Sequence, residues 1–97
     1  MSRYSVVKLP SDHLRQTADR HRQLRRERGW SQAEMAERSG VSLGSLKRFE
    51  QTGQIAFVSL LQLAHVLGRL DDFDPLLRPL EDPDRINRLF DGEIPLT

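Results

Sequence analysis

Two closely spaced helix-start signals, with a glycine between them, constrain the fold of this chain more than any other feature. Residues 31–34 (Ser-Gln-Ala-Glu) form a capping box, in which Ser31 and Glu34 each satisfy a free backbone amide at the start of a helix. A second start signal follows at Ser42, and Gly40 between the two favours the end of the first helix. The sequence therefore predicts two short helices joined by a very short turn.

A hydrophobic residue precedes each of these caps. Trp30 can pack on Met35, and Val41 can pack on Leu46, so an apolar contact holds the chain as it enters each helix. The second helix of the pair is expected over about residues 43–51. Two helices joined by a short turn that contains glycine are the signature of a helix-turn-helix unit.

A longer helix is expected before this pair. Ser11 is its predicted cap, and apolar residues recur at helical spacing down to Gly29, which ends the helix in a left-handed conformation. His21 lies on the apolar stripe and is expected to be a half-buried packing residue. The other faces of this helix carry arginines: Arg15, Arg20, Arg22, Arg25, Arg26 and Arg28.

Three more helices are expected after the pair. A helix from about Phe57 to Leu67 is apolar on so much of its circumference that it belongs at the centre of a core or at a subunit contact. Residues 71–77 are expected to form a short fifth helix, and residues 82–92 a small helical tail. The predicted fold is all-α, with five helices and a small sixth. We divide the chain into an N-terminal arm (1–10), a helical domain (11–79) and a C-terminal tail (80–97).

The composition excludes several classes of protein and site. The chain has no cysteine, which excludes disulfides and thiolate metal sites and favours a reducing cytoplasm. No segment approaches the ~20 apolar residues of a membrane helix, and the N-terminal residues lack the apolar run of a secretory signal. His13, His21 and His65 have no partners at metal-ligand spacing, and no phosphate loop or nucleophile elbow is present. We therefore expect no enzymatic activity, no metal and no cofactor.

The charge is distributed unevenly along the chain, although the formal net charge is only +1. Residues 1–54 contain 11 Lys and Arg against 6 Asp and Glu, whereas residues 55–97 contain 4 Arg against 8 Asp and Glu. A basic first part suggests a polyanionic partner, and an acidic second part suggests a different one. The alternative is the solvated surface of an ordinary domain.

A longer pattern surrounds the helix-turn-helix signature. It comprises residues 29–36, residues 40–42, Leu46, residues 49–50, residues 60–64 and residues 67–68. On these residues the chain resembles the lambda-repressor-like (Xre-type) helix-turn-helix family, over roughly residues 14–78. The resemblance implies a five-helix domain that binds double-stranded operator DNA, with its third helix in the major groove.

The helix over residues 43–51 has the two faces that this role requires. Leu46 and Phe49 lie on one side and can pack against neighbouring helices, while Lys47 and Arg48 lie on the opposite side. Arg48 can bind two acceptors of one guanine. The alternative is a structural helix with a solvated polar face.

Two residues at the start of this helix depart from the family, whose members often carry polar side chains there. Leu43 can offer only apolar contact, for which a thymine methyl group is the expected partner, and Gly44 can let the backbone approach DNA closely. By family analogy, Gln32 binds a phosphate at the start of the preceding helix. The predicted DNA-binding residues are Ser31, Gln32, Ser42, Leu43, Gly44, Ser45, Lys47, Arg48 and Gln51.

A narrower resemblance concerns residues 45–55 and 70–76, which look like the same segments of HipB-type antitoxins. It implies a homodimer that represses its own operon and binds a HipA-type serine/threonine kinase toxin. We expect the region from Leu70 onward, with the arm at Val6 and Val7, to build the dimer contact. The acidic residues Asp71, Asp72, Asp74, Asp82 and Asp84 are the candidates for the kinase contact. The alternatives are a stand-alone Xre-type regulator and a protein-interaction module with little DNA binding.

Overall fold

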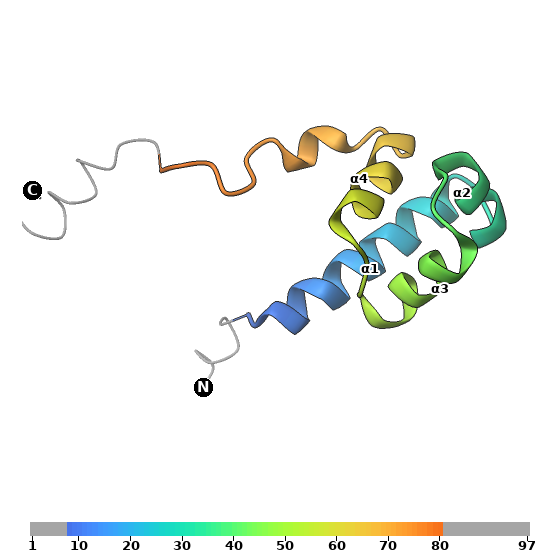
Figure 1. Cartoon of the computed structure of the whole chain (residues 1–97), viewed down its shortest axis with the longest axis horizontal. Helices are drawn as coiled ribbons and strands as arrows, with labels where there is room; N and C mark the ends of the chain where they lie inside the picture. Colours follow the sequence, from blue (N-terminus) through green and yellow to red (C-terminus); the bar gives the residue numbers. More distant parts are fainter. Residues whose placement is uncertain (1–7, 81–97) are drawn as a thin grey trace, which may run out of the picture.

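The computed structural model describes residues 8–80, and over this range the chain is helical with no strand (Figure 1). The α-helices are α1 (Pro10–Glu27), α2 (Gln32–Ser39), α3 (Leu43–Thr52) and α4 (Phe57–Val66), followed by a 3-10 turn, η2 (Leu70–Phe73). The all-α prediction is therefore confirmed for these residues. None of the described helices is long and apolar enough to cross a membrane.

The caps of α2 and α3 are those that the sequence predicts. The Ser31 hydroxyl accepts a hydrogen bond from the Glu34 amide at 3.0 Å, and the Ser31 amide donates to Glu34 Oε1 at 3.0 Å. Ser42 Oγ accepts from the Ser45 amide at 3.1 Å. Gly40 ends α2 with φ at 81°, a left-handed conformation that costs a residue with a Cβ about 1–2 kcal/mol. These contacts confirm the predicted helix pair and its short turn.

The start of α1 differs from the prediction that Ser11 caps it. The helix begins at Pro10, and Leu9 occupies the cap position. Proline suits the first helical turn because its missing amide would have no partner there. Asp12, which lies in the first turn, accepts a hydrogen bond from the Leu9 amide at 2.8 Å.

The predicted fifth helix over residues 71–77 is wrong, because only the single turn η2 forms there. Pro75 lacks the amide hydrogen that would continue an α-helix to the carbonyl of Asp71. The chain instead makes turns, in which the Leu76 amide donates to the Phe73 carbonyl at 3.0 Å, and Leu77 adopts a φ of 56°. The predicted helical tail and most of the predicted N-terminal arm lie outside the described residues.

The core lies where α1, α2, α3 and α4 meet. Seven buried apolar residues form it: Ala18, Met35, Val41, Leu46, Phe49, Leu63 and Leu67. Trp30 packs against the same cluster, in agreement with its predicted place before the α2 cap. The N-terminal end of α4 is less well covered, since Phe57 and Val58 are 53% and 63% exposed. The core therefore covers the apolar residues of α4 only in part.

Candidate nucleic-acid interface

Helix α3 presents a polar, basic face to the surface. Leu46, Phe49 and Glu50 are buried, whereas Lys47 and Arg48 are exposed. The buried positions lie three or four residues apart, so they share one side of the helix and leave the other side uncovered. Four more of the predicted site residues are exposed along α3 or at its start: Ser42, Gly44, Ser45 and Gln51, with Leu43 at 36% exposure.

Gly44 lies at an exposed position in the first turn of α3. A Cβ placed on this residue would meet no atom within 4 Å, and its φ is not in the left-handed region. Neither packing nor backbone conformation within residues 8–80 therefore requires a glycine here. Glycine is a weaker helix former than alanine, by up to about 1 kcal/mol in a helix interior and by less in a first turn, so a requirement outside the fold would explain its presence.

The side chain of Arg48 is held in place on the exposed face of α3. Its Nη2 atom donates a hydrogen bond to Gln54 Oε1, in the loop that follows the helix. Thr52 anchors the same loop, because its hydroxyl accepts a hydrogen bond from the Gln54 backbone amide at 3.1 Å. The guanidinium of Arg48 is thereby directed along the surface that α3 shares with the α3–α4 loop.

At the start of α2, Gln32 is tied to the interior. Its Nε2 atom donates to Glu50 Oε1 at 3.0 Å, and the side chain is only partly exposed. Ser31 is exposed, and its hydroxyl is occupied by the capping bond to Glu34. The two predicted phosphate contacts thus lie together at the N-terminus of α2, which attracts anions through its free amides.

Glu50 is the centre of a buried polar cluster that joins α1, α2 and α3. Its two carboxylate oxygens accept hydrogen bonds from Arg25 Nε at 2.8 Å and Arg25 Nη2 at 2.9 Å, a bidentate pair. His21 Nδ1 lies 2.8 Å from Glu50 Oε2, and Arg22 Nη2 donates to the Glu50 carbonyl at 2.7 Å. Only 3% of Glu50 is exposed, with 5% of His21 and 7% of Arg25.

The surroundings shift the pKa of both titratable members of this cluster. Burial alone would raise the pKa of Glu50, but the hydrogen bonds from Arg25 and Gln32 and the charge of Arg25 outweigh it and lower the pKa to about 2. Burial lowers the pKa of His21 below its ordinary value, and the neighbouring Glu50 offsets only part of this effect. Glu50 is therefore an anion at neutral pH, and His21 is uncharged. His21 Nε2 is buried without a hydrogen-bond partner among the described residues.

A family model that describes a helix-turn-helix domain matches residues 16–76. The chain belongs to the helix-turn-helix domain family. The Xre-type resemblance is confirmed at this level, whereas the narrower resemblance to HipB-type antitoxins is not. No curated protein and no solved structure shows significant similarity to the chain.

Sequence reasoning missed the buried cluster of this helix-turn-helix domain. His21 does pack against the core, with its ring 5.4 Å from that of Phe49, but it also contacts a carboxylate. One signal was present: Arg25 follows Ala18 and His21 at helical spacing, which places it on the buried stripe of α1. An arginine at such a position requires a buried acidic partner.

Proposed function

We propose that this protein is a sequence-specific DNA-binding transcriptional regulator. Its membership of the helix-turn-helix family implies DNA binding, and the exposed face of α3 supports that role. The observation that carries the proposal is the composition of this face, where Lys47, Arg48 and Gln51 share the exposed side of α3 with Gly44. Such a face offers both charge for the phosphates and donors for base edges in the major groove.

The residues of α3 and α2 take different roles in this proposal. Arg48 reads a guanine, Leu43 contacts a thymine methyl group, and Gly44 allows the helix backbone to approach the groove. Ser42 and Ser45 lie at the N-terminal end of α3, which enters the major groove in this proposal. The Ser42 hydroxyl donates a hydrogen bond to the Ser45 hydroxyl at 2.9 Å. At the start of α2, Ser31 and Gln32 face the phosphate backbone.

We further propose that the regulator acts as a homodimer and a repressor in the cytoplasm. Several apolar side chains from the start of α4 onward are exposed, among them Phe57, Val58, Leu70, Leu76 and Leu77. Burying these side chains against a second copy would remove them from water. The dimer would present two α3 helices to half-sites about 34 Å apart.

The finer proposal is an antitoxin role, with a HipA-type kinase as the partner. It rests on the resemblance of residues 45–55 and 70–76 to HipB-type proteins, and exposed acids support it. Asp71, Asp72 and Asp74 are exposed around η2, and Asp72 pairs with Arg69 at 2.9 Å. Charge reversal of Asp72 and Asp74 should weaken co-purification with a kinase encoded beside this gene and leave DNA binding intact. An unchanged complex would show that this surface is not the contact.

The test of DNA binding is selection followed by titration. The purified protein is incubated with a random pool of duplexes, the bound duplexes are sequenced, and the enriched duplex and a scrambled duplex are titrated at two salt concentrations. A regulator should enrich a defined sequence, bind it more tightly than the scrambled duplex, and lose affinity steeply with salt. Absence of binding to either duplex at low salt would leave the interaction-module alternative instead.

A further inference from the structure

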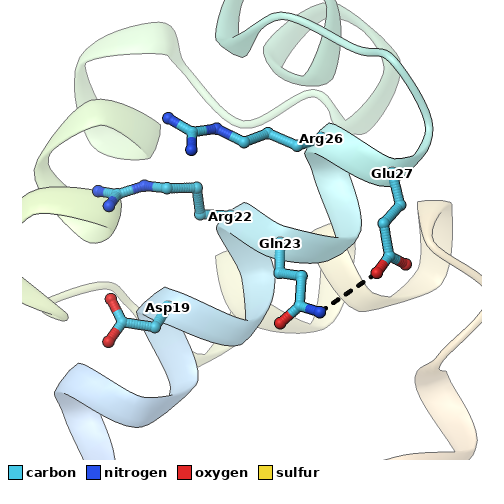
Figure 2. Close-up of a pocket in the computed structure, with 5 residues that line it drawn as sticks. All are labelled: Asp19, Arg22, Gln23, Arg26 and Glu27. Carbon is cyan, nitrogen blue, oxygen red and sulfur yellow. Dashed lines mark hydrogen bonds between the residues drawn. The ribbon is translucent and has the colours of Figure 1, made fainter.

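Helix α1 carries two arginines beside the proposed DNA interface that the sequence analysis did not include in it. Arg22 and Arg26 lie one turn apart on the same side of α1 and line a surface pocket with Asp19, Gln23 and Glu27. Figure 2 shows both guanidinium groups projecting in the same direction, whereas Glu27 points to the other side of the helix and accepts a hydrogen bond from Gln23. The side of α1 that holds Arg22 and Arg26 is therefore basic towards its C-terminal end.

The contacts of Arg22 place this basic side next to α3 and the start of α2. Arg22 Nη2 donates to the Glu50 carbonyl at 2.7 Å, and Arg22 Nε lies 3.6 Å from Glu50 Oε1. The same Oε1 atom accepts the hydrogen bond from Gln32. Arg22 and the proposed phosphate-binding residue of α2 are thus neighbours around one carboxylate oxygen. The Arg22 side chain remains 37% exposed, so part of its guanidinium faces solvent.

The three arginines on this side of α1 differ in how their donors are used. Arg25 directs Nε and Nη2 at Glu50 and Nη1 at the Trp30 carbonyl, so it is committed to the interior. Arg26 is exposed, and its guanidinium makes no hydrogen bond or ion pair within residues 8–80. Arg22 has an anionic neighbour in Glu50, but the charge of that carboxylate is already paired with Arg25, so this side of α1 keeps a net positive charge. Asp19, which lines the same pocket, forms no ion pair with Arg22 or Arg26 within residues 8–80.

We infer that Arg22 and Arg26 bind the DNA backbone and extend the interface from the N-terminus of α2 onto α1. The ligand is the sugar-phosphate backbone of the DNA strand whose phosphates contact the N-terminal amides of α2, at the edge of α3. Guanidinium groups suit this ligand because each can donate two hydrogen bonds to one phosphate. The inference rests on the proposed DNA binding, to which it adds the residues that hold the backbone on one side of the recognition helix.

The test measures the salt dependence of DNA affinity for matched charge variants. Arg26→Gln is the main variant because Arg26 has no partner among the described residues, and Arg22→Gln is the second. Arg20→Gln is the control, since it removes the same charge from an exposed position on nearly the opposite side of α1 from Arg22. Each protein is first checked for an unchanged melting temperature. The logarithm of the dissociation constant is then followed against the logarithm of salt concentration on an enriched and a scrambled duplex.

If the inference is right, Arg26→Gln lowers the slope of this plot by about 1 and weakens binding to both duplexes by similar factors. Arg20→Gln keeps the wild-type slope. Equal slopes for wild type, Arg26→Gln and Arg20→Gln would overturn the inference and leave the proposed function standing. A loss confined to the enriched duplex would also overturn it, because it would indicate a base contact. A wild-type protein that binds neither duplex would overturn the proposed function and this inference together.

Discussion

The side-chain amide of Gln32 donates a hydrogen bond to Glu50 Oε1 at 3.0 Å, and this bond ties the first residue of α2 to the buried carboxylate of α3. The same carboxylate is held by Arg25 of α1. The relative positions of the α2 N-terminus and the α3 surface therefore depend on one buried anion. Because both elements belong to the proposed DNA interface, the cluster that supports Glu50 also supports the spacing between phosphate and base contacts.

The first prediction concerns the stability that this anion provides. Glu50→Gln keeps the size of the side chain but leaves the buried Arg25 guanidinium without its opposite charge. We expect the free energy of unfolding to fall by about 3 kcal/mol or more, as for other buried pairs that lose one partner. Urea denaturation measures this change. Glu37→Gln, at an exposed position of α2, should change it by less than about 0.5 kcal/mol, and similar losses for both variants would contradict the prediction.

The second prediction is that stability falls as the solution becomes acidic. The pKa of Glu50 is about 2 in the folded protein against an ordinary value of 4.5, so the unfolded chain binds more protons in this interval. Stability present above pH 4.5 is thus lost as the pH falls towards 2, by an amount on the order of 3 kcal/mol. Burial also lowers the pKa of His21, so further stability is lost as the pH falls below 6.5.

Thermal denaturation at a series of pH values separates the two groups. His21→Gln should flatten the profile just below pH 6.5 and keep the loss below pH 4.5, whereas His13→Gln, at an exposed position, should keep the wild-type profile. A His21→Gln profile that parallels the wild type down to pH 5 would show that His21 does not contribute.

The third prediction compares two glycines, Gly44 in the first turn of α3 and Gly53 at its C-terminal end. Gly44→Ala should stabilise the fold by about 0.4–1 kcal/mol, because alanine restricts the unfolded chain and its Cβ would meet no atom within 4 Å. The same change should weaken DNA binding if the Gly44 backbone approaches the groove. Gly53→Ala is the contrasting variant, since φ there is 84° and a Cβ would lie 2.7 Å from Leu14 Cβ. It should destabilise the fold, and unchanged DNA affinity of Gly44→Ala would exclude close approach at that residue.

The fourth prediction separates residues that read the base sequence from those that hold the backbone. Arg48→Ala should cost about 1–3 kcal/mol of binding free energy on the enriched duplex and much less on a scrambled one, because a bidentate guanine contact is specific. Gln32→Ala should weaken both duplexes by similar factors. Leu46→Ala is the control for misfolding, since Leu46 is fully buried and its truncation should cost about 2–5 kcal/mol of stability. Equal losses on both duplexes for Arg48→Ala would reassign Arg48 to the phosphates.

The fifth prediction concerns the oligomeric state. We expect sedimentation velocity to find a dimer at micromolar concentration, because exposed apolar residues such as Val58 and Leu77 would be buried between two copies. A charge at the contact should dissociate the dimer, so Val58→Glu should shift the protein towards monomer while the melting profile stays cooperative. A wild-type protein that is a monomer at micromolar concentration would contradict the proposed dimer, and with it the expected pair of DNA half-sites.

Local signals in the sequence determined where most helices begin and end. The hydroxyls of Ser31 and Ser42 bond to amides three residues away, so their effect is independent of the rest of the fold. Helical spacing likewise predicted that Leu46 faces the core and Arg48 the surface. The predicted fifth helix was wrong for a reason that is also local: the acids at its start suggested a helix, but Pro75 removes a bond that the helix needs.

Only the tertiary structure decided the surroundings of Glu50. Its partners Arg25 and Gln32 are 25 and 18 positions away in the sequence, and a glutamate on a short helix is ordinarily exposed to water. Packing of α1 against α3 turns this carboxylate inward, away from the solvent that would stabilise its charge. An ion removed from water must find opposite charge and hydrogen-bond donors within the protein, and α1 and α2 supply them from segments that no local pattern relates to Glu50.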